Sequence, residues 1–175
     1  MQEYFDSIQK GVDSIYSLAT KARAKKYDPE PTPSIILAKD MAERVEGLIS
    51  TVAPQLKGKG ASKRIRELEK KYGFLDWRVS LVIAEEVANE KYCKFKDKLE
   101  AMEVGIRTGF AYHTLGTVSS PLEGFVKLEI KKRRDGKEYF CVFYSGPIRS
   151  AGGTGSSVSL LIADYIRKKK RIFNL

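Results

Sequence analysis

The segment Val126-Lys-Leu-Glu-Ile-Lys-Lys-Arg-Arg-Asp-Gly-Lys-Glu-Tyr-Phe-Cys-Val-Phe-Tyr144 decides the fold class of this chain. Apolar and charged residues alternate through its first six positions, which predicts a half-buried strand. Its last six positions are mostly aromatic or β-branched, and these residue types favour strands. The dipeptide Asp135-Gly136 lies between the two runs and is typical of a two-residue hairpin turn, whose central residues both need positive φ. The sequence therefore predicts an antiparallel hairpin in which Ile130 faces Cys141.

The clearest helix is expected over the first 26 residues, where apolar side chains recur in steps of three and four. Its apolar stripe consists of Phe5, Ile8, Val12, Ile15, Ala19 and Ala22. Such a stripe can pack on the core of the domain or on a partner helix. Three alternating prolines then end the helix and hold the next segment extended. We therefore expect a helical arm (1–26), a Pro-rich spacer (27–33) and an α+β domain (34–175).

Four more helices are expected before the hairpin, and each has local boundary signals. Asp40, Ser62 and Asp76 are predicted to cap the first three at their N-termini, and Gly73 is predicted to end the second. The fourth covers residues 95–111. Their apolar faces are predicted to contain Met41, Val45, Leu48, Ile49, Val52, Ile65, Leu68, Tyr72, Val79, Ile83, Val87, Leu99, Met102, Ile106 and Phe110.

A glycine-rich loop and a terminal helix follow the hairpin, so the expected class is α+β with a helical N-terminal half of about five helices. The helix is predicted to bury Val158, Leu161, Ile162, Tyr165 and Ile166. The loop has neither the lysine of a Walker A motif nor the glycine spacing of a dinucleotide fold. Free N–H groups before a helix can still bind a phosphate, and the candidate residues are Arg149, Ser150, Gly152, Gly153 and Thr154. The alternative is a tight turn in which the glycines allow unusual φ or close packing.

The chain is strongly basic, with 32 Lys and Arg against 22 Asp and Glu and a formal charge of +10. An excess of this size favours a polyanionic partner, with nucleic acid ahead of a membrane surface. Besides the five residues of the glycine-rich loop, the candidate DNA-binding residues form three clusters, namely Lys57, Lys59, Lys63, Arg64, Arg66, Lys70 and Lys71; Lys131, Lys132, Arg133, Arg134 and Lys137; and Arg167, Lys168, Lys169 and Lys170. The alternative is that these clusters are solvated charged faces that bind nothing.

Composition excludes several classes of protein. With 42% hydrophobic and 31% charged residues in 175 positions, the chain is expected to fold rather than stay disordered. It has no apolar run of about 20 residues and no secretory signal pattern, so we expect a cytoplasmic protein. Two cysteines and one histidine are too few for a structural zinc site. No nucleophile has a neighbouring base, and adjacent Glu85 and Glu86 would point in different directions on a helix, so no catalytic site is expected.

The run Gly146-Pro-Ile-Arg-Ser-Ala-Gly-Gly-Thr154 resembles the N-terminal region of the large subunit of archaeal family-D DNA polymerase. Residues 161–167 extend the resemblance. It also includes Tyr27-Asp-Pro29, residues 38–46, Ile106-Arg-Thr-Gly109 and Pro121-Leu-Glu-Gly124.

This resemblance implies a replicative polymerase that adds deoxynucleotides to a primer 3′ end with a divalent metal such as Mg²⁺. The resemblance also implies a small subunit that carries a 3′–5′ exonuclease. In the family's large subunit, the catalytic aspartates and the zinc-binding cysteines lie downstream of the region that this chain resembles. The implied role is therefore a non-catalytic module without a cofactor of its own, which contacts primer–template DNA, the small subunit and the rest of the large subunit. Phe5, Ile8, Val12 and Ile15 are the candidates for assembly or self-association. The alternative is a purely structural assembly or dimerisation module with no DNA contact.

Overall fold

The computed structural model describes residues 2–27, 37–116 and 119–170. The chain separates into two compact units, residues 1–39 and 40–175. Most of the predicted spacer (28–33) lies outside the described residues, and the division into arm, spacer and domain stays a prediction. Within the described ranges, no helix combines the length and the apolar character needed to cross a lipid bilayer.

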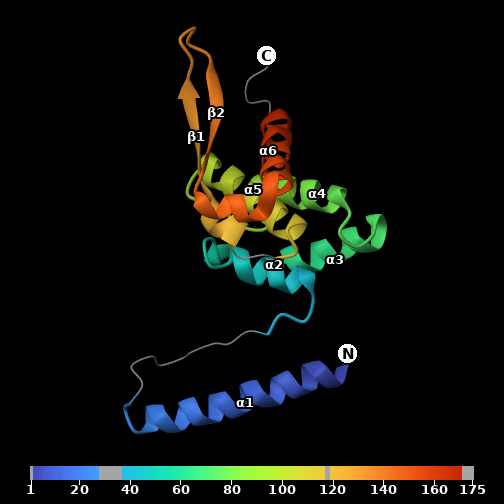
Figure 1. Cartoon of the computed structure of the whole chain (residues 1–175), viewed down its shortest axis with the longest axis vertical. Coiled ribbons are helices and arrows are strands. Elements are labelled where there is room, and N and C mark those ends of the chain that lie inside the picture. Colours follow the sequence, from blue (N-terminus) through green and yellow to red (C-terminus); the bar gives the residue numbers. More distant parts are fainter. Residues whose placement is uncertain (1, 28–36, 117–118, 171–175) are drawn as a thin grey trace. The chain divides into compact units, whose positions relative to one another are not determined.

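Helices account for most of the described chain, and a two-stranded antiparallel sheet follows them (Figure 1). The elements in chain order are α1 (Gln2–Ala24), α2 (Met41–Ile49), the 3-10 turn η1 (Pro54–Leu56), α3 (Ala61–Tyr72), α4 (Trp77–Ala88), α5 (Lys98–His113), the π-helical turn η2 (Ser119–Gly124), β1 (Phe125–Lys132), β2 (Glu138–Tyr144), the 3-10 turn η3 (Gly146–Ala151) and α6 (Gly152–Lys169). This order confirms the predicted α+β class.

Helix α1 belongs to the first unit and confirms the helix predicted over residues 1–26. Phe5, Ile8 and Val12 are half-buried, whereas Ile15 of the same stripe is 54% exposed. No side chain of α1 is fully buried. The helix therefore keeps much of its apolar surface open.

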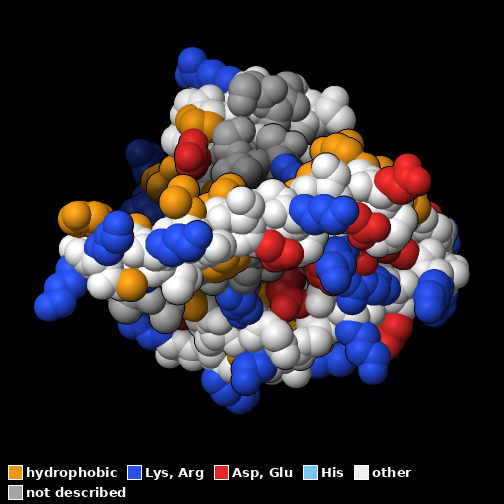
Figure 2. Space-filling model, turned by 90° about the horizontal axis from the view of Figure 1, so that it is seen from below, with side chains coloured by type: hydrophobic (Ala, Val, Ile, Leu, Met, Phe, Trp, Pro, Cys, Tyr) orange, Lys and Arg blue, Asp and Glu red, His pale blue; other side chains and the backbone are white. Residues whose placement is uncertain are grey.

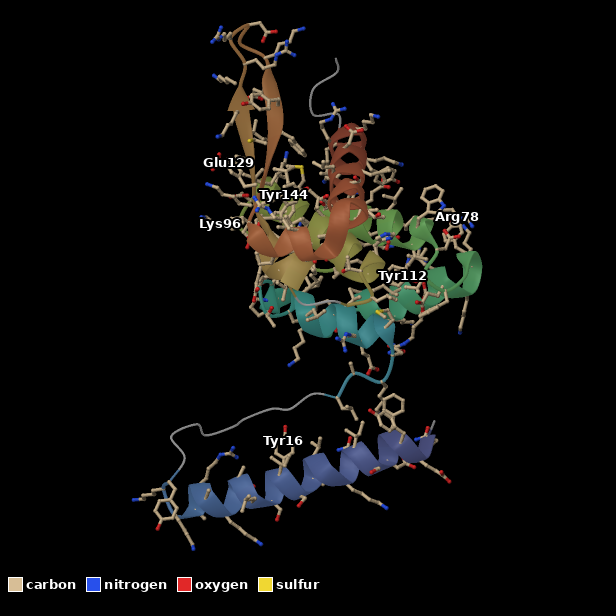
Figure 3. The ribbon with its side chains drawn as sticks, in the orientation of Figure 1. Tyr16, Arg78, Lys96, Tyr112, Glu129 and Tyr144 are labelled. Atoms are coloured by element: carbon tan, nitrogen blue, oxygen red, sulfur yellow. The ribbon has the colours of Figure 1, made fainter. Side chains whose placement is uncertain are left out.

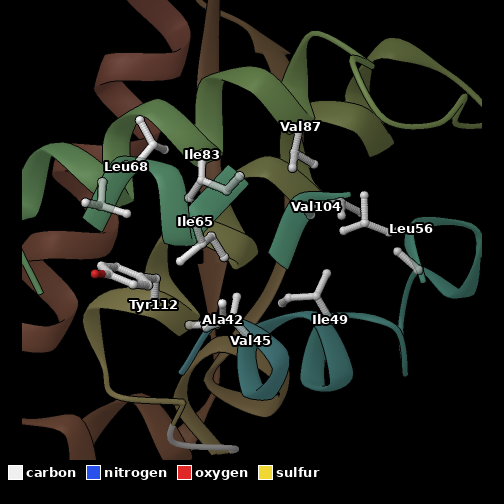
Figure 4. Close-up of a cluster of buried hydrophobic side chains, with 14 residues drawn as sticks. Ala42, Val45, Ile49, Leu56, Ile65, Leu68, Ile83, Val87, Val104 and Tyr112 are labelled. Carbon is white, nitrogen blue, oxygen red and sulfur yellow. The ribbon is translucent and has the colours of Figure 1, made fainter. Parts of the chain in front are cut away.

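Helix α5 is the centre of the second unit, because two buried clusters lie on its opposite faces. One cluster packs α2, α3 and α4 on α5 (Figure 4) and includes Val45, Ile49, Ile65, Leu68, Ile83, Val87, Val104 and Tyr112. The other packs α4, β1 and α6 on α5 and includes Leu81, Ile106, Phe110, Phe125, Leu128, Ile162 and Ile166. Two predicted core residues are instead exposed, Val52 (44%), which follows the end of α2, and Leu161 (57%), which faces away from the core.

Two glycines let α4 and α5 approach each other closely. A Cβ atom added at Gly105 would lie 2.6 Å from the main-chain oxygen of Ala84, and one at Gly109 would lie 2.6 Å from that of Ser80. Real Cβ atoms do not approach backbone this closely, so any side chain at either position would push the two helices apart.

The helix caps are predicted correctly where the cap is local. Asp40 accepts from the Glu43 N–H at 2.9 Å, Asp76 accepts from the Arg78 N–H at 2.8 Å, and Gly73 ends α3 with a φ of 107°.

The predicted cap Ser62 is wrong, because α3 begins at Ala61 after Gly60. The carboxylate of Glu46, on α2, accepts instead from the N–H groups of Gly58 (2.7 Å) and Ser62 (2.8 Å). Burial acts to raise the pKa of Glu46, but these hydrogen bonds outweigh it and hold the pKa below its usual value.

The hairpin is confirmed, but its predicted register is wrong by one residue. Ile130 pairs with Phe140, because the turn has three loop residues rather than two. The Gly136 N–H donates to the Arg133 carbonyl at 3.0 Å, and the Arg133 N–H donates to the Lys137 carbonyl at 2.6 Å. Gly136 has a φ of 83°, while Asp135 is not among the residues with positive φ. This is a type I turn followed by a glycine bulge.

The glycine-rich segment is more helical than predicted. Residues 146–151 form the 3-10 turn η3, and α6 already begins at Gly152 instead of near Val158. Glycine is tolerated in the first turn of a helix, and the described glycines with positive φ are Gly58, Gly60, Gly73, Gly116 and Gly136. The unusual φ expected in the tight-turn alternative is therefore wrong for the described glycines of this segment.

Candidate nucleic-acid interface

The hairpin and the C-terminal half of α6 both extend from the helical body in the same direction (Figure 1). A groove of about 320 Å³ lies between β2 and α6. It is lined by the apolar side chains Phe140, Val142, Leu160 and Ala163, together with Tyr139, Arg133, Glu138, Asp164 and Arg167. The second and third basic clusters of the sequence therefore flank one groove.

The hairpin tip carries an excess of positive charge. Residues 131–138 contain five basic and two acidic side chains. Arg133 pairs with Asp135 at 3.2 Å, and Lys131 pairs with Glu129 at 3.4 Å. The cations of this tip that have no carboxylate partner among the described residues are Lys132, Arg134 and Lys137. These three exposed charges are the ones most available to an external anion.

The end of α6 is basic as well, although acids neutralise part of its charge. Asp164 pairs with Arg167 (2.8 Å) and Lys168 (2.9 Å), and hydrogen bonds from these two cations lower the pKa of Asp164. Lys169 lies 3.4 Å from Glu85, while burial lowers the pKa of Lys170. Four basic side chains against one acid over residues 164–170 still leave a positive rim on the groove.

The first basic cluster lies on α3 and the loop before it, away from the hairpin in Figure 1. Two of its arginines hold helices together: Arg64 pairs with Glu86 at 3.0 Å, and Arg66 pairs with Asp40 at 2.6 Å. The exposed lysines of the cluster are Lys57, Lys59, Lys63, Lys70 and Lys71. On the face drawn in Figure 2, basic side chains likewise form separate groups with acidic side chains between several of them. The structure thus brings two of the three clusters together.

The glycine-rich candidates lie at the other end of α6. Arg149, Gly153 and Thr154 are exposed, while the side chains at 150–152 lie outside the described part of the chain. Lys168 lies fifteen positions after Gly153 in the same helix, which corresponds to about 22 Å along the helix axis. An anion at this N-terminus would therefore not touch the basic groove.

An ion pair on α5 between the buried Arg107 and the partly buried Glu103 fixes the base of the hairpin. The Arg107 side chain is 6% exposed. Its guanidinium donates at 2.5–3.0 Å to the main-chain carbonyls of Pro121, Leu122, Phe125 and Val126. Glu103 accepts from Arg107 at 2.8 Å and from the Leu128 N–H at 3.0 Å, so both members of the pair also hold β1.

A hydrogen bond also joins the hairpin to α6. The hydroxyls of Tyr144 and Ser159 lie 2.6 Å apart, and Figure 3 shows Tyr144 near the base of the hairpin, with Glu129 further along it. Sequence reasoning missed Glu103, Arg107, Tyr144 and Ser159. An arginine within the apolar pattern of residues 99–110 was the one available signal.

Three of the sequence segments that carry the family resemblance meet at this base. Arg107 from the first segment binds the carbonyls of the second, Pro121-Leu-Glu-Gly124. A Cβ atom at Gly124 would lie 2.9 Å from the main-chain nitrogen of Ile148, which belongs to the third. These three segments therefore form the base on which the hairpin is anchored.

The described residues include no cluster of three or more His, Cys, Asp or Glu side chains that could hold a metal ion. The single histidine, His113, has its pKa lowered by burial.

Comparison with known proteins shows the family to which the chain belongs. The family model described as "DNA polymerase II large subunit DP2, N-terminal" matches residues 3–174. A DNA polymerase II large subunit of Nanoarchaeum equitans is 48% identical over 97% of this chain and 14% of its own length. The DNA polymerase II large subunit of Methanosarcina barkeri is 42% identical over 96% of this chain and 14% of its own length. That of Thermococcus kodakarensis is 40% identical over 97% of this chain and 9% of its own length. The chain belongs to the family of N-terminal regions of the DNA polymerase II large subunit.

Proposed function

We propose that this region binds the sugar–phosphate backbone of DNA through the basic hairpin tip and the basic end of α6. The observation that carries the proposal is that two basic segments flank one groove, with three cations at the hairpin tip that have no carboxylate partner among the described residues. Phosphate contacts of this kind position a protein on DNA without reading its sequence. Primer–template DNA is thus the proposed partner.

The chemistry of nucleotide addition belongs, in this proposal, to the whole polymerase. The relatives are named as polymerase large subunits, and this chain covers only 14% of the length of its Nanoarchaeum relative. We place the Mg²⁺-dependent catalytic site outside the described residues, and we place the 3′–5′ exonuclease in the small subunit. This region contributes binding and assembly.

The test is DNA binding measured by fluorescence anisotropy at several salt concentrations. The triple variant Lys132→Gln, Arg134→Gln, Lys137→Gln is expected to reduce the slope of log K against log [salt] by about 3, because each lost phosphate contact removes about 0.9. The matched control, Lys57→Gln, Lys59→Gln, Lys63→Gln, removes the same charge from the first basic cluster at exposed positions and leaves the slope nearly unchanged. Equal losses in the two variants, or binding that does not depend on salt, would contradict the proposal.

A second proposed role is assembly through α1. The observation in its favour is that Ile15 and Leu18 are 54% and 69% exposed on a helix without a fully buried side chain. An exposed apolar stripe of this kind is typical of a helix that packs on another chain.

Ile15→Asp is expected to lower the mass measured by analytical ultracentrifugation, because a charge in an apolar helix interface is left without a partner. Ser17→Asp, at an exposed position of the same helix, is the control and leaves the mass unchanged. If Ile15→Asp has the same mass as the parent chain, both alone and when mixed with the small subunit, the stripe has no role in assembly.

A further inference from the structure

The connection between α3 and α4 carries two large exposed aromatic side chains that the basic groove does not use. Phe74 is 66% exposed and Trp77 is 61% exposed, although side chains of this size are usually mostly buried. They are separated by two residues in a tight turn that begins after Gly73.

The turn holds these rings outward because it is anchored from the core. Leu75, between them in sequence, packs on the first buried cluster and has a φ of 58°, which is unusual for a residue with a branched side chain. Its N–H donates at 2.9 Å to the hydroxyl of the fully buried Tyr112, which donates in turn to Glu69 at 2.8 Å. The turn is therefore built to a fixed shape, with Leu75 inside and its aromatic neighbours outside.

The turn that carries the exposed rings is basic, although Asp76 pairs with Arg78 at 2.8 Å. Residues 70–78 contain three basic side chains, Lys70, Lys71 and Arg78, and one acid, Asp76. Lys71 and Arg78 lie 4.8 and 4.7 Å from the centroid of the Tyr72 ring, so this ring brings both cations to the same turn. Figure 3 shows Arg78 at the outer edge of the helical body and Tyr112 further inside.

We propose that this turn is a second DNA site, which stacks unpaired bases of single-stranded DNA on Phe74 and Trp77 and holds the adjoining phosphates with Lys70 and Lys71. Exposed planar rings on a turn with a net positive charge match the two chemical groups of a nucleotide strand. Bases within a duplex are already stacked on one another, so the site selects single strands. The choice of DNA rests on the proposed function, whereas the site itself is separate from the hairpin.

Trp77 is the single tryptophan of the chain, so its fluorescence reports on this turn alone. Titration of the chain with a short oligothymidylate is expected to quench this emission to saturation. A duplex of the same length is expected to bind the chain, as measured by fluorescence anisotropy, but to quench the Trp77 emission less than the oligothymidylate does.

Phe74→Ala is expected to weaken the oligothymidylate affinity measured from Trp77 by about tenfold, the loss typical of one base–aromatic stack. The control is Tyr27→Ala, which removes an aromatic ring that is 78% exposed in the other unit and leaves the affinity unchanged. Both replaced side chains are exposed, and circular dichroism checks that the two variants stay folded.

The outcomes separate this proposal from that of the hairpin. The hairpin triple variant is expected to lose salt-dependent duplex binding while Trp77 is still quenched by oligothymidylate. If single-stranded DNA binds by anisotropy without changing Trp77 emission, or if Phe74→Ala binds as tightly as the parent, the stacking site is wrong and the hairpin proposal stands. If the small subunit changes Trp77 emission and oligothymidylate does not, the turn is a protein contact and the proposal is overturned.

Discussion

Replacing Arg107 with methionine is expected to lower the free energy of unfolding by about 3–5 kcal/mol, because it removes a buried guanidinium that satisfies several main-chain carbonyls and a partly buried carboxylate. Methionine fills a similar volume but donates no hydrogen bond. Four main-chain carbonyls of η2 and β1 would lose their donor, and Glu103 would keep a charge without its partner. Urea denaturation followed by circular dichroism measures the change.

The matched control for this substitution is Arg66→Met. Arg66 also bonds two acids, Asp40 and Glu43, but its side chain is 39% exposed. An ion pair in such a position contributes about 1 kcal/mol or less, because water solvates both partners when the pair is broken. Equal losses for the two variants would show that Arg107 is not the anchor of the hairpin.

Phe110→Ala is also expected to cost about 3–5 kcal/mol, the usual range for deleting a fully buried phenyl ring. Phe110 is 0% exposed and lies in the cluster that joins α4, α5, β1 and α6. The deletion would leave a cavity that these elements cannot close without moving. The loss is measured as a lower midpoint in urea at unchanged slope.

Leu161→Ala is the comparison for Phe110→Ala, because helical periodicity predicts that Leu161 lies in the core as well. The structure leaves it 57% exposed, so its replacement is expected to change stability by no more than about 0.5 kcal/mol. A loss of several kcal/mol for Leu161→Ala would contradict the orientation of α6.

The contrast between Leu161 and Phe110 shows that sequence patterns predict some features of the fold and not others. Signals that act within a few residues are predictable, as for the caps Asp40 and Asp76 and the positive-φ glycine Gly73. The cap supplied by Glu46 to α3 is not, because its acceptor comes from another helix 12 to 16 residues earlier. The hairpin register likewise depends on a choice between turn types that the same Asp-Gly dipeptide allows.

The candidate interface is likewise only partly predictable from the sequence. Composition identifies the basic clusters, but their relative placement is a property of the tertiary fold. Residues far apart in sequence neutralise Arg64 and Arg66, since Glu86 and Asp40 come from neighbouring helices. The pairing of the hairpin with α6 across one groove also depends on the buried contacts of Arg107 and Tyr144, which no charge pattern reveals.

The close approach at Gly105 and Gly109 has a consequence beyond packing. Arg107 lies between these two glycines on the same helix, and its guanidinium must meet four carbonyls at once. Any side chain that wedges α5 away from α4 would carry this guanidinium out of line with its acceptors. The close packing of α5 on α4 and the orientation of the hairpin are therefore linked, and a single methyl group added at either glycine is expected to shift the basic hairpin tip as well.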